Sequence, residues 1–252
     1  MKSKPVKTAI TRIAPGEIDL RGHALVDLMG NHSFSEVVFL LLSGRLPDPK
    51  EARLLDAVLV SCVDHGVNAP SAFVARTVAS CGSPVQTAIA AGISAVGEHH
   101  GGAGEACARL LQGAVARVGE AGLEAGAQEI VQTYRSIDER LPGFGHRVHN
   151  PDPRAERLFA LAQELGLWGL HSRLLIAIQA AWLDAVGKTL PVNVDGAIAG
   201  ILSDLGFDWR LGKSFFIIAR SAGLAAHVHE QITTGKPLQF APAVEVEFLT
   251  EE

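Results

Sequence analysis

The sequence predicts an all-α protein, and three observations support this fold class. Apolar residues recur at helical spacing along most of the 252 residues. Several of these apolar runs follow a capping residue with an acid three positions later, which is typical of a helix start. Strand-like alternation is confined to two short stretches around the turn dipeptide Pro15-Gly16, which predict a small hairpin over residues 8–22.

The N-terminal half contains three helices with clear start signals. Residues 33–36 read as a capping box before an apolar run, and Gly44 ends that helix. Residues 48–51 start the next helix with a cap, a proline in the first turn and an acid at the third position. A third helix begins in residues 83–86 and is expected to end at Gly97, directly before a pair of histidines.

The second half continues the helical pattern. Helices are predicted over residues 103–118, 125–140, 153–165, 171–186, 196–205 and 213–234. Repeats, low-complexity tracts and a flexible linker between domains are not found in the sequence.

Composition excludes several classes of function. Hydrophobic residues make up 48% of the chain, enough for a sizeable core without disulfides. The net charge is −5 without a basic stripe, so nucleic acid is not an expected partner. The longest apolar run, residues 37–42, is too short to span a bilayer, and residues 1–8 lack the apolar core of a signal peptide. Three scattered cysteines, Cys62, Cys81 and Cys107, indicate free thiols and a reducing, cytoplasmic location.

Three separate segments place proton-transfer groups beside glycines or at helix starts. Residues 98–104 contain His100 followed by two glycines, and residues 142–154 contain His146 after a Gly-Phe-Gly sequence. The third segment contains Asp195 in an Asn-Val-Asp-Gly sequence before a small-residue helix. Two histidines and an aspartate can move protons both to and from carbon. Two of them also have a purely structural interpretation: His100 as a solvated turn residue, and Asp195 as a helix N-cap.

Two arginines and one further histidine are candidates for holding a carboxylate. Arg154 falls in the first turn of a helix capped by Asp152, where a cation opposes the helix dipole, so a carboxylate ligand would offset that cost. An ordinary surface arginine is the alternative. Arg220 lies in an apolar helix and needs an acidic or anionic partner if buried. His65 is interpreted as a helix-end residue.

Metal and dinucleotide sites are not expected. The chain has ten histidines, but Cys-x-x-Cys and His-Glu-x-x-His patterns are absent. His227 and His229 are two residues apart and so point to different sides of a helix. The Gly-x-Gly-x-x-Val run at residues 143–148 follows no strand, which excludes a Rossmann site.

These motifs resemble the citrate synthase superfamily, and most of all its short citryl-CoA lyase branch, which includes the C-terminal module of ATP-citrate lyase. The most specific matches are His100-Gly-Gly-Ala, Gly-Phe-Gly-His146-Arg-Val with Asp-Pro-Arg154, and Asn-Val-Asp195-Gly. Residues 33–47 and the Asp-His element ending in His65 also fit this family.

The resemblance implies an all-α homodimer, or a higher homo-oligomer. A large domain would comprise residues 1–104 and 205–252, and a smaller, mobile, CoA-facing domain residues 105–204. Asp195 would be the acid/base at the acetyl carbon, His100 would hydrogen-bond the enolate oxygen, and His146 would exchange a proton with the citryl hydroxyl. His65, Arg154 and Arg220 would hold carboxylates, with a coenzyme A thioester as substrate and no tightly bound cofactor.

The sequence also departs from the family in ways that bear on the reaction. Full-length synthases carry a longer N-terminal helical region, and the segment from His146 to Arg154 is one residue shorter here. Cys62 and Ala241-Pro242 stand where synthases have a histidine and an Arg-Pro pair. His100, in contrast, matches synthases rather than the ATP-citrate lyase module, which has an aromatic residue there.

The leading hypothesis is therefore cleavage of citryl-CoA to acetyl-CoA and oxaloacetate. A separate citryl-CoA synthetase is a candidate partner that would supply the citryl-CoA. Citrate synthase or 2-methylcitrate synthase, running the same carbon chemistry forward, is the first alternative. A catalytically silent CoA-binding or partner subunit is the second, and a metal-dependent hydrolase is a distant third.

Overall fold

The computed structural model describes residues 6–146 and 151–238, and most of these residues are helical, as the sequence predicts. The helices and 3-10 turns, in chain order, are α1 (Leu25–Leu28), α2 (Phe34–Ser43), α3 (Pro49–Ser61), α4 (Pro70–Ser80), α5 (Val85–Ser94), α6 (Ala103–Val118), η1 (Glu120–Gly122), α7 (Leu123–Ser136), α8 (Pro153–Leu165), α9 (Leu170–Val186), α10 (Val194–Asp204), η2 (Trp209–Leu211) and α11 (Gly212–Thr234).

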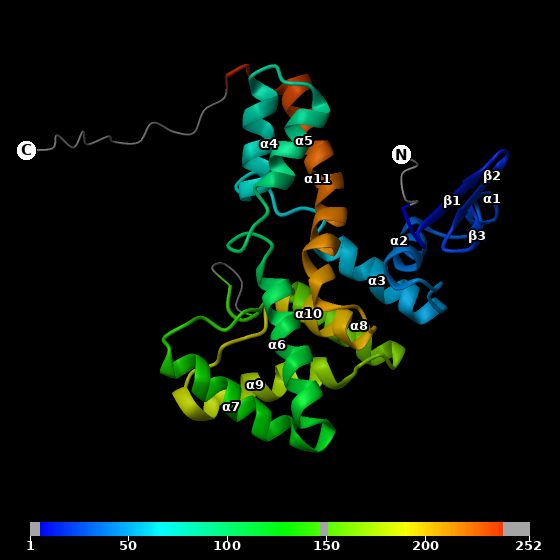
Figure 1. Cartoon of the computed structure of the whole chain (residues 1–252). Helices are drawn as coiled ribbons and strands as arrows, with labels where there is room; N and C mark the ends of the chain where they lie inside the picture. The colour runs from blue at the N-terminus through cyan, green and yellow to red at the C-terminus, as the bar shows by residue number, and fades with distance from the viewer. Residues whose placement is uncertain (1–5, 147–150, 239–252) are drawn as a thin grey trace, which may run out of the picture.

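A small antiparallel sheet precedes the helices. β1 (Thr11–Ala14) and β2 (Glu17–Leu20) form the predicted hairpin, and β3 (His23–Ala24) adds a short third strand that the sequence analysis did not anticipate. Gly16 has a φ of 77°, a conformation that glycine adopts without strain and that closes the hairpin after Pro15. The sheet and α1 stand apart from the main helical body, attached through α2 and α3 (Figure 1).

The long helix α11 connects the two ends of the helical body. Its second half packs beside α4 and α5, and its first half reaches the region of α6, α8 and α10 (Figure 1). Helices α6, α7 and α9 lie together at the opposite end from α4 and α5 (Figure 1). The starts of α6, α8 and α10 therefore come together near the middle of the molecule.

Three clusters of buried apolar side chains stabilise this arrangement. One joins α2, α3, α8, α10 and α11, with Phe39, Leu54 and Phe215 fully buried in it. A second joins α6, α7 and α9, and a third, rich in alanine, joins α4, α5 and α11. The first cluster contains side chains from both of the two domains expected above, and the division at residues 104 and 205 stays a prediction.

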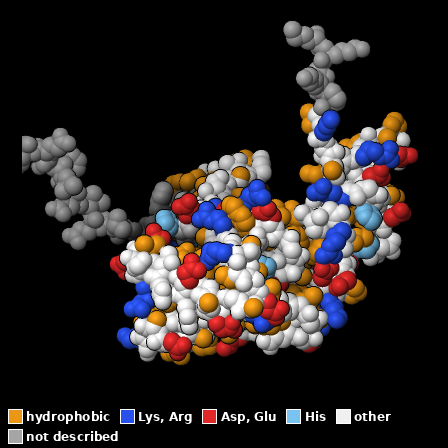
Figure 2. All heavy atoms as spheres, turned by 60° about the horizontal axis from the view of Figure 1, so that its bottom comes forward, with side chains coloured by type: hydrophobic (Ala, Val, Ile, Leu, Met, Phe, Trp, Pro, Cys, Tyr) orange, Lys and Arg blue, Asp and Glu red, His pale blue; other side chains and the backbone are white. Residues whose placement is uncertain are grey.

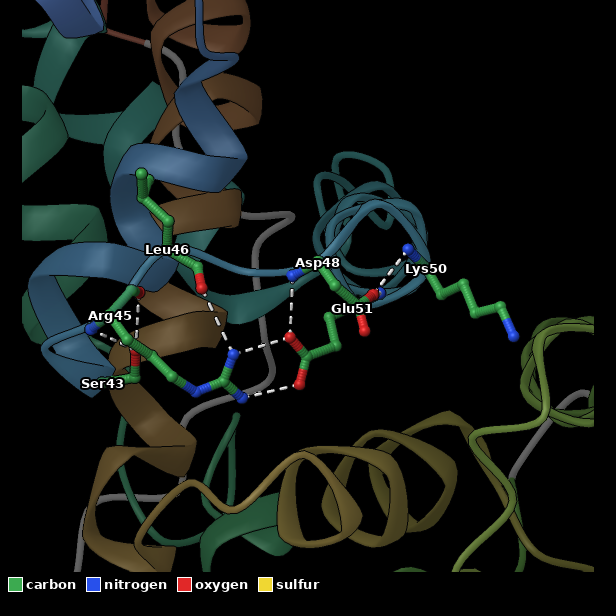
Figure 3. A network of polar contacts seen from close by, with 6 residues as sticks. All are labelled: Ser43, Arg45, Leu46, Asp48, Lys50 and Glu51. Carbon is green, nitrogen blue, oxygen red and sulfur yellow. Dashed lines mark hydrogen bonds and ion pairs between the residues drawn. The ribbon is translucent and has the colours of Figure 1, made fainter.

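The connection between α2 and α3 is fixed by a polar network that the capping signals predicted. Asp48 accepts the backbone N–H groups of Lys50 and Glu51, and Glu51 accepts the N–H of Asp48 at 2.9 Å (Figure 3). Arg45 then binds both carboxylate oxygens of Glu51, at 2.6 and 2.7 Å (Figure 3). This network sets the direction of α3, whose far end leads into the candidate site.

Several helix boundaries differ from the prediction. α4 was not predicted, because its N-cap is Ala69, which offers no side-chain hydrogen bond. α5 ends at Ser94 rather than Gly97, so an irregular turn precedes the histidine pair. α7 runs over Leu123–Ser136 rather than 125–140. The helices expected at 103–118 and 153–165 have the predicted bounds.

The described surface is mixed in charge on the face shown in Figure 2, where basic and acidic side chains are interspersed. Within residues 6–146 and 151–238, no helix has the length and apolar character needed to cross a membrane.

Candidate active site

The Gly-Phe-Gly-His146 segment is fastened to the strand-like stretch before α10. Phe144 pairs with Val192 in an isolated antiparallel bridge, and Gly145 donates its N–H to Pro191 at 2.8 Å. Asn193 donates its side-chain N–H to the carbonyl of Gly145 at 2.7 Å. These contacts hold the backbone just before His146 against the start of the helix that carries Asp195.

Glycine is required at one point of this contact. An added Cβ at Gly143 would lie 2.7 Å from the Cα of Gly196 and 2.7 Å from the sulfur of Cys107, and Gly143 has a φ of 85°. Both the close approach and the positive φ exclude other residues without a shift of the backbone. The glycine-rich motif therefore serves to bring the His146 loop onto α10.

Asp195 is the second residue of α10. The N-cap is Asn193, whose side chain accepts the N–H of Gly196 at 3.1 Å. The interpretation of Asp195 as the N-cap is therefore wrong, since Asn193 performs that role and the Asp195 carboxylate is not needed for it. A carboxylate in the first turn of a helix is stabilised by the helix dipole.

His146, His65 and Arg154 lie close together beside α10. The rings of His65 and His146 are 5.8 Å apart between centroids and perpendicular to each other. Nη1 of Arg154 is 3.5 Å from Nδ1 of His65. His65 was expected at a helix end, but α3 ends at Ser61 and His65 lies in the loop that follows, so that expectation is wrong.

The buried carboxylate of Asp152 holds Arg154 in place. It accepts from Nε of Arg154 at 3.0 Å and from Nη2 at 2.9 Å, and it caps α8 by accepting the N–H of Arg154, as predicted. Its second oxygen also accepts the N–H of Val194 at 3.1 Å, which ties α8 to α10. The cost of placing Arg154 at a helix start is thus offset within the chain, and an external carboxylate is not needed to explain its position.

His100 and Arg220 are linked through Ser71, a residue that the sequence analysis did not identify. The Ser71 hydroxyl is 2.9 Å from Nε2 of His100 and accepts from Nη1 of Arg220 at 3.3 Å. The backbone N–H of Ser71 also donates to Nε2 of His100 at 3.3 Å. Nε2 is therefore the acceptor nitrogen, which leaves the proton of neutral His100 on Nδ1.

Arg220 is buried, with only 3% of its surface exposed. Besides Ser71, it donates through Nε to the carbonyl of Cys62 at 3.1 Å and lies 4.6 Å above the ring of Phe216. Burial lowers its pKa, while the nearby charges of Asp64, Cys62 and Asp195 raise it. Its contacts within 6–146 and 151–238 are with neutral groups, which leaves room for an anion at this cation.

Electrostatic effects connect the groups of the three segments. Burial raises the pKa of Asp195. The charges of Arg154, His146 and Arg220 lower it, and that of Asp152 raises it further, so all four lie within electrostatic range of this carboxylate. The result is a carboxyl group that holds its proton above the usual pH, as a carbon acid/base requires.

His100 experiences the opposite shift. Burial lowers its pKa, and the positive charges of Arg220 and His65 lower it further. The imidazole is therefore neutral near pH 7 and can donate a hydrogen bond from Nδ1.

The structure thus brings all six predicted residues into one network of contacts and charges: His65, His100, His146, Arg154, Asp195 and Arg220. Their chemical roles stay predictions. Ser71 and the helix-tying function of Asp152 were missed, since a serine in an alanine-rich helix and a capping aspartate carry no functional signal of their own. Residues 147–150 and Ala241-Pro242, also considered above, lie outside the described residues.

Metal-binding geometry was not found where side chains are described: no group of three or more histidine, cysteine, aspartate or glutamate side chains could hold an ion there. The site instead places neutral and cationic groups around Asp195, a carboxyl whose pKa is raised by burial. It can bind an anion, stabilise an oxyanion and transfer protons.

Comparison with known proteins identifies the family to which the chain is similar. Residues 46–240 match the model of the citrate synthase C-terminal domain family. A putative citrate synthase 2 from Mycobacterium tuberculosis is 34% identical over 197 residues, covering 75% of this chain and 50% of the relative. Citrate synthase 2 from Bacillus subtilis is 31% identical over 214 residues, covering 84% and 55%. The chain thus spans about half the length of the curated relatives it matches.

Solved structures extend the comparison to the whole fold. Citryl-CoA lyase from Hydrogenobacter thermophilus superposes with a TM-score of 0.90 at 41% identity, covering 99% of this chain and 96% of that one. Citrate synthase from Thermotoga maritima gives a TM-score of 0.70 at 27% identity, covering 88% and 60%. On the family match, the relatives and the shared architecture, this chain belongs to the citrate synthase family of enzymes.

Proposed function

We propose that this protein cleaves citryl-CoA into acetyl-CoA and oxaloacetate. The observation that carries the proposal is the likeness to a citryl-CoA lyase, at 41% identity and a TM-score of 0.90. The synthase from Thermotoga maritima is less similar, at 27% identity and a TM-score of 0.70.

The first step of the proposed reaction is removal of a proton from the citryl hydroxyl by His146. The carbon–carbon bond then breaks, the hydroxyl oxygen becomes the ketone of oxaloacetate, and the bonding electrons pass to the acetyl thioester as an enolate. Positioned general bases typically contribute about 10²–10⁴-fold to such a step.

His100 would stabilise the enolate oxygen that forms. Its acceptor nitrogen is occupied by Ser71, so Nδ1–H is the group available to the thioester. A neutral imidazole held in this way supplies a preorganised donor without a counter-charge to neutralise.

Asp195 would complete the reaction by giving its proton to the enolate carbon, which yields the methyl group of acetyl-CoA. Burial raises the pKa of Asp195, which favours the protonated form that this step requires. His146 has gained one proton and Asp195 has lost one, so exchange with solvent resets the site. Arg220, Arg154 and His65 would hold the carboxylates of the oxaloacetate part.

Citrate synthase or 2-methylcitrate synthase activity is the second candidate. It is favoured by the curated relatives, which include citrate synthases and a citrate/2-methylcitrate synthase from Bacillus subtilis. The same residues would act in the opposite direction, followed by hydrolysis of the thioester. A non-catalytic CoA-binding subunit is the remaining alternative.

Product analysis with two substrate mixtures separates these candidates. With citryl-CoA, a lyase forms oxaloacetate and acetyl-CoA in equal amounts, read by coupled oxidation of NADH and by chromatography. With acetyl-CoA and oxaloacetate, rapid stoichiometric release of free CoA would identify a synthase and contradict the lyase proposal. Absence of turnover in both mixtures would favour the non-catalytic subunit.

Assembly and location belong to the same proposal. We expect a homodimer or a higher homo-oligomer, supplied with citryl-CoA by a separate synthetase in the cytoplasm. Light scattering after size-exclusion chromatography measures the first expectation, and a monomer at micromolar concentration would contradict it.

A further inference from the structure

Helix α11 contacts the loop after α3 at three successive positions on one face. Arg220 donates to the carbonyl of Cys62 at 3.1 Å, and His227 Nε2 lies 3.0 Å from Oδ1 of Asp64. Between them, an added Cβ at Gly223 would lie 2.3 Å from the carbonyl oxygen of Val63. Spacings of three and four residues place all three on the same side of the helix.

The carboxylate of Asp64 joins His227 to the backbone around His65. Its second oxygen accepts the N–H of Gly66 at 2.9 Å. Burial raises the pKa of Asp64, but the backbone N–H groups of Gly66 and His65 and the charge of His227 outweigh this and hold the pKa below its ordinary value. Asp64 is therefore ionised at neutral pH and binds both the loop backbone and α11.

The loop that carries His65 is exposed to solvent. The stretch from Val63 to Asn68 is exposed, and α4 does not begin until Pro70. The ring of His65 nevertheless lies 5.8 Å from that of His146 and within 3.5 Å of Arg154. Contacts that fasten the loop backbone next to His65 therefore help to hold its side chain in this position.

We propose that His227 is a positioning residue for the substrate: by binding Asp64, it holds the loop so that the His65 imidazole meets a carboxylate of the oxaloacetate part. His227 itself does not touch the reacting atoms. The inference rests on the proposed function for the identity of the ligand, but the contacts among α11, Asp64 and the loop stand without it.

The test compares His227→Ala and His227→Gln with His229→Ala, an exposed histidine on the same helix. Loss of a hydrogen bond to a charged partner is expected to raise KM for citryl-CoA and Kd for oxaloacetate about tenfold in His227→Ala. The kcat is expected to stay within about threefold, because the proton-transfer groups are untouched. Gln, whose amide N–H can reach Asp64, should recover most of the affinity, and His229→Ala should match the wild type.

The contact between His227 and Asp64 can also be tested by removing the charge of Asp64. Asp64→Asn leaves α11 unchanged and should raise KM and Kd in the same way. The double variant with His227→Ala should be scarcely weaker than either single variant, because both remove one shared interaction. Circular dichroism reports whether each variant is folded.

Unchanged KM and Kd in both His227→Ala and Asp64→Asn would overturn the inference, and so would equal losses in His227→Gln and His227→Ala. A wild-type protein that does not cleave citryl-CoA would contradict the proposed function alone. In that case, weaker oxaloacetate binding by His227→Ala, measured by calorimetry, would still support the positioning role.

Discussion

The Ser71 hydroxyl lies 2.9 Å from Nε2 of His100, and the backbone N–H of the same residue donates to that nitrogen. Because Arg220 donates to the Ser71 oxygen, the hydroxyl proton is free to point at His100. One buried serine thus selects the Nδ1–H form of the imidazole and connects it to a buried cation.

Ser71→Ala is expected to lower kcat for citryl-CoA by about tenfold to a hundredfold. The variant leaves Nη1 of Arg220 without its hydroxyl acceptor and loosens His100, at a cost of about 1–3 kcal/mol. Steady-state kinetics measure the change. Ser94→Ala removes a hydroxyl that binds only its own helix, at Ala90, and serves as the control. A Ser71→Ala variant as active as this control would contradict the assigned tautomer role.

Asp195→Asn is expected to lower activity and raise stability together. Activity should fall by about 10²–10⁴-fold, because the acid/base group is lost. Burial raises the pKa of Asp195 in the folded state. The stability that the protonated carboxyl contributes is therefore present below the unfolded-state pKa, and it is lost as pH rises through the folded-state pKa. At pH 7, well above the unfolded-state pKa of an aspartate, the burial of this carboxyl is therefore a net cost, and the variant should be more stable than the wild type. Urea unfolding at pH 7 measures this, and a less stable variant would refute it.

Asp152→Ala is expected to destabilise the fold by about 3 kcal/mol, because it leaves Arg154 and the Val194 N–H without their buried partner. Glu164→Ala, on the same helix, removes an exposed ion pair with Arg53 and should cost less than about 1 kcal/mol. Equal effects of the two variants on urea unfolding would show that Asp152 does not tie α8 to α10.

The lowered pKa of Asp152 predicts that the stability of the protein depends on pH. Burial raises the pKa of Asp152, but hydrogen bonds from Arg154 and Val194 and the charge of Arg154 lower it below its ordinary value. Its stabilising contribution is therefore complete above about pH 4 and is lost as pH falls further, through the lowered pKa. Urea midpoints from pH 6 downward should converge for wild type and Asp152→Ala, and parallel curves would count against this coupling.

Thiol labelling is expected to modify Cys81 alone in the folded protein. Cys81 is exposed, whereas Cys62 and Cys107 are buried. Burial raises the pKa of Cys62 to about 12 and raises that of Cys107 as well, so neither forms a thiolate at pH 8. Mass spectrometry after iodoacetamide treatment should show one label without urea and three with it. Rapid labelling of Cys62 would show that the buried side of the site opens readily.

The sequence predicted the fold class and most helices because caps and apolar spacing are local signals. The capping boxes at Ser33 and Asp48 are formed as expected. α4 was missed because its N-cap, Ala69, offers no side-chain hydrogen bond, which left Pro70 in the first turn as its start signal. Packing of Ala72 and Ala75 against α5 and α11 stabilises the helix instead. Likewise, β3 depends on pairing with β2 rather than on its own two residues.

The candidate site was predictable only in its most distinctive residues. Glycine-flanked His100 and His146 stand out in the sequence, but the link from Ser71 to Arg220 joins residues 149 positions apart. The interpretation of Asp195 as an N-cap was wrong because Asn193, two residues earlier, caps the helix by accepting the N–H of Gly196. Contacts between distant segments form only when the chain packs. The sequence of either segment alone therefore does not show which residues of the other it contacts.

The most direct measurement is a crystal structure with oxaloacetate and a non-cleavable thioether analogue of acetyl-CoA. We expect the oxaloacetate carboxylates to contact Arg154, Arg220 and His65. Nδ1 of His100 should lie at the position of the thioester oxygen, and the Asp195 carboxylate should lie at the acetyl carbon. Binding of both ligands away from these residues, or a His100 side chain turned away from the thioester-like group, would contradict a single site shared by the six residues.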